Sequence, residues 1–269
     1  MIHPLRRLLL LLFALALTAC AACTTASGAS VGLDDPVKKK TAMQLVSSAE
    51  NSSLDWQAQY RYIEDIHDNR GYTAGIIGFC TGCGDLLQVV RRYTKAEPDN
   101  PLKPFIPALT AVKGSDSHEG LGDPFVSAWR KAAADPAMRA AQDAERDRQY
   151  FNPAVGQAKA DGLGALGQFI YYDAFVMHGA EDSPGSVGFN TLRERAMKKV
   201  RTPHDGGDQT AYLNAFLDVR VDAIRHEPTH ADTSRIDTAQ RVFLKQGNLD
   251  LDTPLSWKVY GDSYHIAKR

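Results

Sequence analysis

Residues 50–73 read ENSSLDWQAQYRYIEDIHDNRGYT, and at this stretch a helical chain changes into a short sheet. Upstream, Asp34-Asp35-Pro36 predicts the start of a helix, because Asp is a favoured N-cap and Pro suits the first helical position. Apolar residues at helical spacing continue this helix to about Glu50. The short polar residues that follow compete for backbone hydrogen bonds, so we expect the helix to end there.

Two short strands and a polar turn are expected next. Residues 58–64 and 72–79 have strand character, and residues 65–71 between them are polar. Elsewhere apolar residues recur at helical spacing, which predicts helices over 86–95, 103–113, 124–134, 136–150, 154–178, 188–200, 208–226 and 234–246. We therefore expect an α+β fold that is mostly helical and has one small early sheet.

Two of these helices carry a charge within their apolar stripe. In 154–178 the apolar residues recur at steps of three and four, and Asp173 falls among them. In 208–226 Arg220 does the same. A charge that is buried alone is very costly, so we expect Asp173 to pair with Arg220 or with another buried arginine. The alternative is a rotated helix that leaves each charge at the rim of its stripe.

Composition and charge describe a folded protein with a concentrated acidic segment. The chain has 269 residues, of which 43% are hydrophobic and 23% are charged, and this excludes disorder as the main state. The formal net charge of −1 argues against a nucleic-acid-binding protein, although it does not exclude a local patch. Residues 50–85 hold only two basic residues, Arg61 and Arg70. They hold six acidic ones, which are Glu50, Asp55, Glu64, Asp65, Asp68 and Asp85.

Two carboxylates on different elements are what glycoside hydrolysis requires, one to protonate the leaving oxygen and one to activate water or attack carbon. Glu50 lies at a helix end beside Leu54 and Trp56, where it could keep its proton as the acid. Asp68 lies in the polar turn, where it would stay ionised as the base. Acidic turns are also common on solvated surfaces, so composition alone leaves that alternative open.

The order of residues in this segment is more specific than its composition. Glu50-Asn51 is followed by Tyr60 and then by Asp68-Asn69-Arg70-Gly71-Tyr72-Thr73. In this order and spacing the chain resembles the chitosanases of glycoside hydrolase family 46. The resemblance covers residues 33–264 and includes Ala158-Lys159-Ala160-Asp161-Gly162-Leu163, Tyr171-Tyr172-Asp173-Ala174, Val176-Met177-His178-Gly179 and Asp232-Thr233-Ser234-Arg235.

The resemblance implies a two-lobed, lysozyme-like α+β fold, with the small antiparallel sheet in the minor lobe and a cleft between the lobes. It implies an endo-acting enzyme that hydrolyses the β-1,4 bonds of chitosan, a cationic glucosamine polymer, with inversion. By position, Glu50 matches the general acid and Asp68 the general base. Thr73 matches a residue that helps to hold the attacking water. No cofactor and no metal are implied, and we expect a monomer.

Further positions match substrate and support sites of the family. The residues that match subsite positions are Ser52, Tyr62, Arg70, Asp85 and His230. Among these, the carboxylate of Asp85 is suited to select a free amine over an acetamide. The residues that match a buried ion network reaching Glu50 are Asp173, Arg220 and Arg235. One position departs from the pattern, because Cys83 stands where relatives carry a hydroxyl residue, and a thiol is a poor hydrogen-bond donor.

Two motifs suggest other chemistry and are given less weight. Cys80-Thr81-Gly82-Cys83 has the spacing of a thioredoxin-type redox motif, but no βαβ series surrounds it. We favour structural cysteines there, with a local disulfide and a redox site as alternatives. His226-Glu227-Pro228-Thr229-His230 has the order of a zinc-protease motif, yet Pro228 would break the helix that this motif needs. We expect the preceding helix to end near His226.

The N-terminus predicts export. Arg6 and Arg7 precede an apolar run from Leu8 to Leu17, which is too short to span a bilayer. Leu17-Thr18-Ala19-Cys20 resembles a bacterial lipobox with Cys20 as the lipid acceptor, and ordinary cleavage nearby is the alternative. We expect a signal peptide at 1–19, a flexible linker at 20–33 and a catalytic domain at 34–269. The mature protein would be a periplasmic or outer-membrane lipoprotein, or otherwise secreted, and would touch the membrane only through its lipid.

Two rival functions remain from the sequence. One is a lysozyme-like enzyme that cleaves peptidoglycan in the cell envelope, and the other is a non-catalytic lipoprotein that binds an amino-sugar polymer. Asp85 argues against the first, because N-acetylated sugars offer no cation to a carboxylate. The presence of Glu50, Asp68 and Thr73 together argues against the second.

Overall fold

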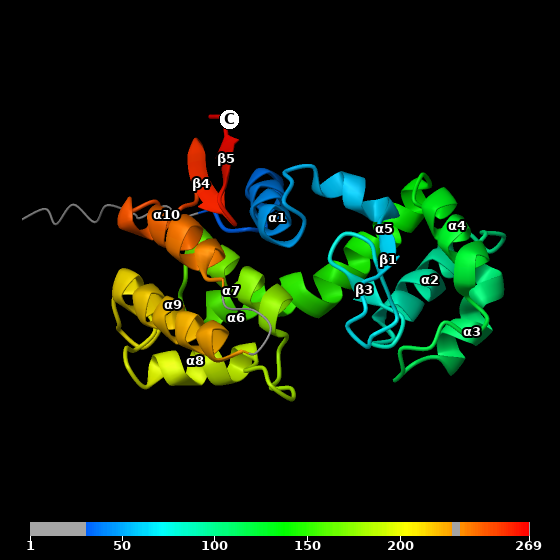
Figure 1. Ribbon diagram of the computed structural model, residues 1–269. Coiled ribbons are helices and arrows are strands. Elements are labelled where there is room, and N and C mark those ends of the chain that lie inside the picture. Colours follow the sequence, from blue (N-terminus) through cyan, green and yellow to red (C-terminus); the bar gives the residue numbers. More distant parts are fainter. Residues whose placement is uncertain (1–30, 228–231, 269) are drawn as a thin grey trace, which may run out of the picture.

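The computed structural model describes residues 31–227 and 232–268, which form two lobes side by side (Figure 1). Each lobe has its own hydrophobic core. The larger core draws on residues 33–49 and 151–266, and the smaller one on residues 60–141. The chain therefore starts in the major lobe, builds the minor lobe, and returns.

The major lobe is helical and carries a hairpin near the C-terminus. Its helices are α1 (Pro36–Glu50), α6 (Asn152–Ala160), α7 (Ala165–His178), α8 (Phe189–Met197), α9 (Gln209–His226), the π-helical η4 (Ile236–Gln240) and α10 (Arg241–Lys245). The strands β4 (Leu255–Val259) and β5 (Asp262–Ile266) pair antiparallel, and the hairpin lies next to α1 and α10 (Figure 1). Helix α1 begins as expected, because the side chain of Asp35 accepts hydrogen bonds from the amides of Val37 and Lys38.

The minor lobe combines a small sheet with helices. The sheet contains β1 (Ile63–Asp65), β2 (Tyr72–Ala74) and β3 (Phe79–Cys80), all antiparallel in that order. The helices are η1 (Trp56–Arg61), α2 (Asp85–Ala96), η2 (Lys103–Phe105), α3 (Ile106–Ala111), α4 (Gly122–Ala132) and α5 (Pro136–Arg146). Strand β2 places Thr73 opposite Glu64 on β1 and opposite Cys80 on β3.

A continuous helical segment joins the lobes. Helix α5 runs into the π-helical turn η3 (Asp147–Phe151) and then into α6. At this junction Arg146 donates to Asp143 and Asp147, both at 2.7 Å, and Lys39 of α1 lies 2.7 Å from Asp147. Trp56 packs against both cores. The lobes are thus connected by backbone, by ion pairs and by apolar contact.

The predicted fold class is confirmed as mostly helical with small antiparallel strands, but four elements differ from expectation. The single strand predicted over 72–79 ends at Ala74, and a turn leads to the separate strand β3, which pairs back on β2. Residues 58–61 form part of a 3-10 helix instead of a strand, because the side chain of Asp55 caps that helix at the amide of Ala58. The helix predicted over 154–178 is interrupted after Ala160, where Gly162 takes a left-handed conformation with φ of 77°. The hairpin β4–β5 was not expected at all.

The folded body begins before the predicted domain boundary. Leu33 is fully buried, and its amide donates to the side chain of Gln168 at 2.8 Å, although it was assigned to the linker. The predicted signal peptide and Cys20 lie outside the described residues. Among the helices that the structure describes, none has the length and apolar character to cross a membrane.

Candidate active site

Glu50 is the last residue of α1, and an arginine from a distant part of the chain holds it. The Nη2 atom of Arg235 donates to Oε1 of Glu50 at 2.7 Å. The Glu50 side chain is 32% exposed, whereas that of Arg235 is only 5% exposed. One end of this pair is therefore open to a ligand and the other end is anchored inside the major lobe.

Arg235 belongs to a buried network centred on Asp173. The carboxylate of Asp173 accepts from Arg235 at 2.8 Å and from Arg220 at 3.0 Å. It also accepts from the amide of Gln240 at 2.6 Å, and Gln240 in turn accepts from Arg220 at 3.0 Å. The ion pair expected from the two apolar stripes thus forms, and both expected arginines take part in it.

The electrostatics of this network keep Asp173 and Arg220 charged. Burial opposes ionisation of Asp173, but the guanidinium groups of Arg235 and Arg220 lower its pKa to about 2. Burial lowers the pKa of Arg220 to about 10, which leaves it protonated at neutral pH. Asp173 is therefore an anion that fixes Arg235, and Arg235 presents its positive charge to Glu50.

Asp68 lies in the polar turn of the minor lobe and is bound by its near neighbour. Arg70 donates from Nε to Oδ2 of Asp68 at 2.7 Å, and its amide donates to Oδ1 at 3.1 Å. The Nη2 atom of Arg70 lies 2.5 Å from the same Oδ2 in an ion pair. The turn can close this tightly because His67, Asn69 and Gly71 all have positive φ. The Asp68 side chain remains 27% exposed, so it can still reach a ligand.

Thr73 presents a buried hydroxyl that the fold does not satisfy. It occupies the centre of β2, where the sheet covers it on both sides. Within the described parts of the chain, no hydrogen-bond partner lies within reach of its Oγ1 atom. A buried hydroxyl without a partner is costly, and such groups commonly bind water or a ligand.

Five residues match substrate positions, and one of them, Arg70, binds Asp68 as described above. Asp85 is the first residue of α2, and its Oδ1 accepts from the amides of Cys80 and Leu86 at 2.8 and 2.7 Å. Burial raises the pKa of Asp85 to about 6 despite these bonds. Ser52 is exposed, and Tyr62 donates to Glu64 at 3.3 Å. His230 lies outside the described residues.

Cys80 and Cys83 form a disulfide, which corrects the expectation that favoured structural cysteines over a local bond. The two Cα atoms are 5.2 Å apart, because the end of β3 turns directly into α2. Glycine at position 84 permits this turn with φ of 82°. Cys83 therefore carries no thiol, and the two sulfur atoms that lie close to Asp85 are not free metal ligands.

Helix α9 ends within the motif at 226–230, at its first residue. This end at His226 is as expected, and Glu227 accepts from the hydroxyl of Ser186 at 2.9 Å. The remainder of the motif, 228–231, lies outside the described residues.

Gln240 and His178 take part in the network although the sequence did not single them out. Gln240 is 1% exposed and bonds both Asp173 and Arg220. His178 lies 3.5 Å from Nε of Arg220, and burial lowers its pKa to about 3, so the neutral ring accepts this bond. Gln240 could have been found by the same reasoning as Asp173, because it falls among Ile236, Phe243 and Leu244 at helical spacing.

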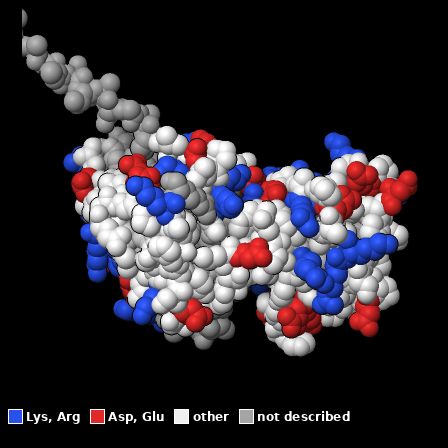
Figure 2. All heavy atoms as spheres, turned by 90° about the horizontal axis from the view of Figure 1, so that it is seen from above, with Lys and Arg blue, Asp and Glu red and all other residues white. Residues whose placement is uncertain are grey.

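The face seen in Figure 2 shows an indentation at its lower edge where the two lobes meet, with acidic side chains on both sides. Glu50 comes from the major lobe and Asp68 from the minor lobe. The two candidate catalytic carboxylates are thus carried by different lobes on separately anchored elements, which is an arrangement that can place a polymer between an acid and a base.

Comparison with known proteins places these residues in a family. The model of glycosyl hydrolase family 46 matches residues 44–255. A chitosanase of Streptomyces sp. (strain N174) is 63% identical over 243 residues, which are 90% of this chain and 87% of that protein. A co-crystal structure of a chitosanase with substrate has a TM-score of 0.82 and 59% identity, and the match covers 88% of this chain and 99% of that chain. A complex of a chitosanase from Gynuella sunshinyii with chitotetraose has a TM-score of 0.77 and 34% identity, covering 86% and 98%.

Proposed function

The chain belongs to glycosyl hydrolase family 46, and from this membership we propose that it is an endo-acting chitosanase that inverts the anomeric centre. The observation that carries the mechanism is the pair of separately anchored carboxylates, Glu50 on Arg235 and Asp68 on Arg70. The named relatives are chitosanases, and no feature of the described residues favours peptidoglycan or a non-catalytic role.

In the proposed reaction Glu50 is the general acid. It gives its proton to the glycosidic oxygen as the bond to the anomeric carbon breaks, so the leaving sugar departs as a neutral alcohol. Arg235 then stabilises the carboxylate that forms, because it already donates to Oε1 and is itself held by Asp173. The buried network thus acts on the acid after proton transfer.

Asp68 is the proposed general base. It takes a proton from a water molecule, whose oxygen attacks the anomeric carbon from the face opposite the leaving group. The unsatisfied hydroxyl of Thr73 supports a role in holding this water, since it has capacity for a hydrogen bond. Arg70 keeps the Asp68 carboxylate oriented, because both its guanidinium and its backbone amide donate to that carboxylate.

Substrate selection is assigned to acidic and polar groups near these residues. We propose that Asp85 binds a glucosamine ammonium group through its second oxygen, because its Oδ1 is engaged by backbone amides. Ser52, Tyr62, Arg70 and His230 are proposed to line neighbouring subsites. The disulfide at Cys83 means that this position offers no side-chain donor to the sugar.

The assignment of the acid is tested with Glu50→Gln, assayed for reducing ends on chitosan and on peptidoglycan. We expect the wild-type protein to release reducing ends from chitosan only. We expect Glu50→Gln to lose this activity by at least about a hundredfold while still binding chitosan oligomers. The matched control is Glu194→Gln, an exposed residue on α8 that should leave the rate unchanged. Unchanged activity in Glu50→Gln would contradict the assignment.

The stereochemistry is tested on the first product. Proton NMR of a fresh digest should show the α anomer at the new reducing end, because the β bond is attacked once from the opposite face. A β product would instead require a covalent intermediate and would exclude the proposed role of Asp68.

Export and lipidation are proposed from the N-terminal sequence alone. Mass spectrometry of the mature protein should show a chain that starts at a diacylglyceryl-modified Cys20. A mature chain that starts at another residue and carries no lipid would contradict the anchor.

A further inference from the structure

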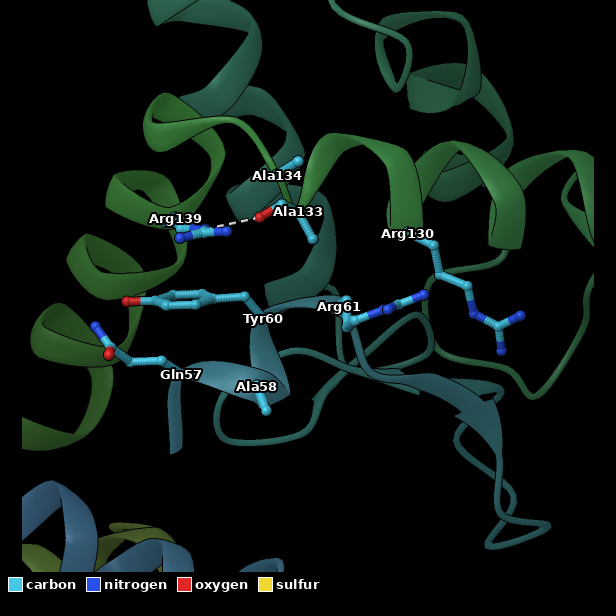
Figure 3. A pocket seen from close by; sticks show the side chains of 8 residues that line it. All are labelled: Gln57, Ala58, Tyr60, Arg61, Arg130, Ala133, Ala134 and Arg139. Carbon is cyan, nitrogen blue, oxygen red and sulfur yellow. Dashed lines mark hydrogen bonds between the residues drawn. The ribbon is translucent and has the colours of Figure 1, made fainter. Parts of the chain in front are cut away.

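The minor lobe contains a second concave surface, which none of the proposed catalytic or substrate-binding residues lines. Its volume is about 370 Å³, and its walls come from η1, the end of α4 and the start of α5 (Figure 3). Three arginines line it, Arg61, Arg130 and Arg139, together with Tyr60 and Gln57. We call this surface the arginine pocket.

The three guanidinium groups of the arginine pocket lack acidic partners. Arg139 donates from Nε to the carbonyl of Ala133 at 2.8 Å, and Arg130 donates to the carbonyl of Ile63 at 3.4 Å. Arg61 has no side-chain hydrogen bond within residues 31–227 and 232–268. Over the same residues, no carboxylate forms an ion pair with any of the three. Three like charges therefore share one surface without compensation.

The acids on neighbouring elements are engaged elsewhere. Asp143 of α5 accepts from Tyr60 at 2.9 Å and pairs with Arg146. Asp135, at the N-terminus of α5, accepts from the hydroxyl of Tyr93 and from the amide of Ala137. Neither carboxylate is available to neutralise the pocket, which is why its positive charge is available to a ligand.

One wall of the arginine pocket is held in place by packing. The guanidinium of Arg139 lies over the ring of Tyr60, 5.6 Å from the centroid, and Figure 3 shows the two groups stacked. The bond from Tyr60 to Asp143 fixes the ring in turn. In the same view Arg61 extends toward the side where Arg130 descends from α4. Arg61 and Arg130 thus extend toward one side of the pocket, while Arg139 lies over Tyr60 on the other side.

We propose that the arginine pocket binds a phosphate group, carried either by a free oligophosphate or by a phosphodiester polymer. A phosphate is tetrahedral and multiply charged, so it can accept hydrogen bonds from several guanidinium groups at once. A carboxylate is planar, carries one charge and is satisfied by a single guanidinium fork. Chitosan is itself a cation, and this pocket would repel it. The site is therefore distinct in charge from the proposed catalytic site.

The test measures binding of inorganic tripolyphosphate by titration calorimetry at constant ionic strength. The test variant is Arg61→Gln with Arg130→Gln, which removes two charges from the pocket. Its control is Arg195→Gln with Arg201→Gln, which removes two charges from exposed positions of the major lobe. We expect the wild-type protein and the control to bind equally, and the pocket variant to bind at least about tenfold more weakly.

Further binding measurements distinguish a free oligophosphate from a phosphodiester polymer and define the results that would contradict the proposal. Binding of poly(glycerol phosphate) as tightly as tripolyphosphate would assign the site to a polymer, and weaker binding would assign it to a free oligophosphate. Equal binding by the pocket variant and the wild-type protein would overturn the proposal. Equal competition by acetate would overturn the selection of phosphate. Chitosan hydrolysis by the pocket variant should remain unchanged, so this test does not depend on the proposed function.

Discussion

At the scale of single residues, Asp173 is the centre of the buried network. Its carboxylate accepts hydrogen bonds from two arginines and from the side-chain amide of Gln240, and it is almost fully buried. Asp173→Asn keeps the shape of the side chain but leaves Arg220 and Arg235 without their counter-ion. Breaking a buried pair from one side is expected to lower the free energy of unfolding by about 3–5 kcal/mol. Urea denaturation near neutral pH measures this, and a loss below about 1 kcal/mol would show that the network is not a structural centre.

Asp85 should make stability depend on pH. Burial raises its pKa to about 6 from 3.8, so its protonated form stabilises the fold below about pH 4, and this contribution is lost as the pH rises through 6. Asp85→Asn cannot ionise. The free energy of unfolding of this variant relative to the wild-type protein should therefore rise between these pH values by about 3 kcal/mol.

The measurement for Asp85 is a series of urea titrations across that pH range on both proteins. A constant difference between them would mean that the carboxyl titrates normally. Protonation of Asp85 should also weaken substrate binding, since a neutral Asp85 below pH 6 would no longer attract the ammonium group that we propose it binds.

Buried charged residues were predictable from the sequence where a charge interrupts an apolar pattern. Asp173 and Arg220 stood out because apolar neighbours surround them at helical spacing, and the structure pairs them. The roles of Glu50, Asp68 and Thr73 came from resemblance and stay proposals. The disulfide was harder to predict than the buried ion pair, because the Cα separation of Cys80 and Cys83 depends on a turn that only the folded structure defines.

At the scale of elements, the break between α6 and α7 depends on one backbone conformation. Gly162 has φ of 77°, and a Cβ there would lie 2.9 Å from the amide nitrogen of His204. Gly162→Ala is therefore expected to lower the free energy of unfolding by at least about 2 kcal/mol.

The control for Gly162 is Gly156, which lies within α6 and has open space where a Cβ would stand. Gly156→Ala should stabilise the protein by about 0.5–1 kcal/mol, since alanine is the better helix former. Thermal unfolding of the two variants should shift in opposite directions. A stabilising Gly162→Ala would contradict the proposed strain.

The elements that the sequence missed share a physical reason. Helical spacing of apolar residues continues across 154–178, and the pattern gives no sign that Gly162 turns left-handed. The first half of the strand predicted over 58–64 is instead a 3-10 helix, which the side chain of Asp55 caps locally. In contrast, β4 alternates buried and exposed residues from Leu255 to Val259, so the period-two pattern of the hairpin was available and was overlooked.

At the scale of the whole molecule, we expect the two cores to unfold as one cooperative unit. The helical segment from α5 to α6 is unbroken, and Trp56 packs against both cores. Phe125→Ala in the minor lobe and Phe216→Ala in the major lobe should each cost about 3–5 kcal/mol. Each should lower the midpoint of a single transition.

Differential scanning calorimetry and far-ultraviolet circular dichroism, applied to both variants, check this cooperativity. The two methods should give the same midpoint for each variant. A second transition that moves with only one of the two substitutions would show that the lobes unfold independently.

The C-terminal hairpin has a consequence for the order in which a working molecule is assembled. Trp257 of β4 donates to Ser48 of α1 at 3.0 Å, and Arg235 holds Glu50 at the end of the same helix. The helix that carries the proposed acid is made before the minor lobe, but Arg235 and Trp257, which anchor it, are made after that lobe. A nascent chain thus holds both candidate carboxylates before it can fix Glu50 in place, and the anchors of α1 are complete only after Trp257 has been made.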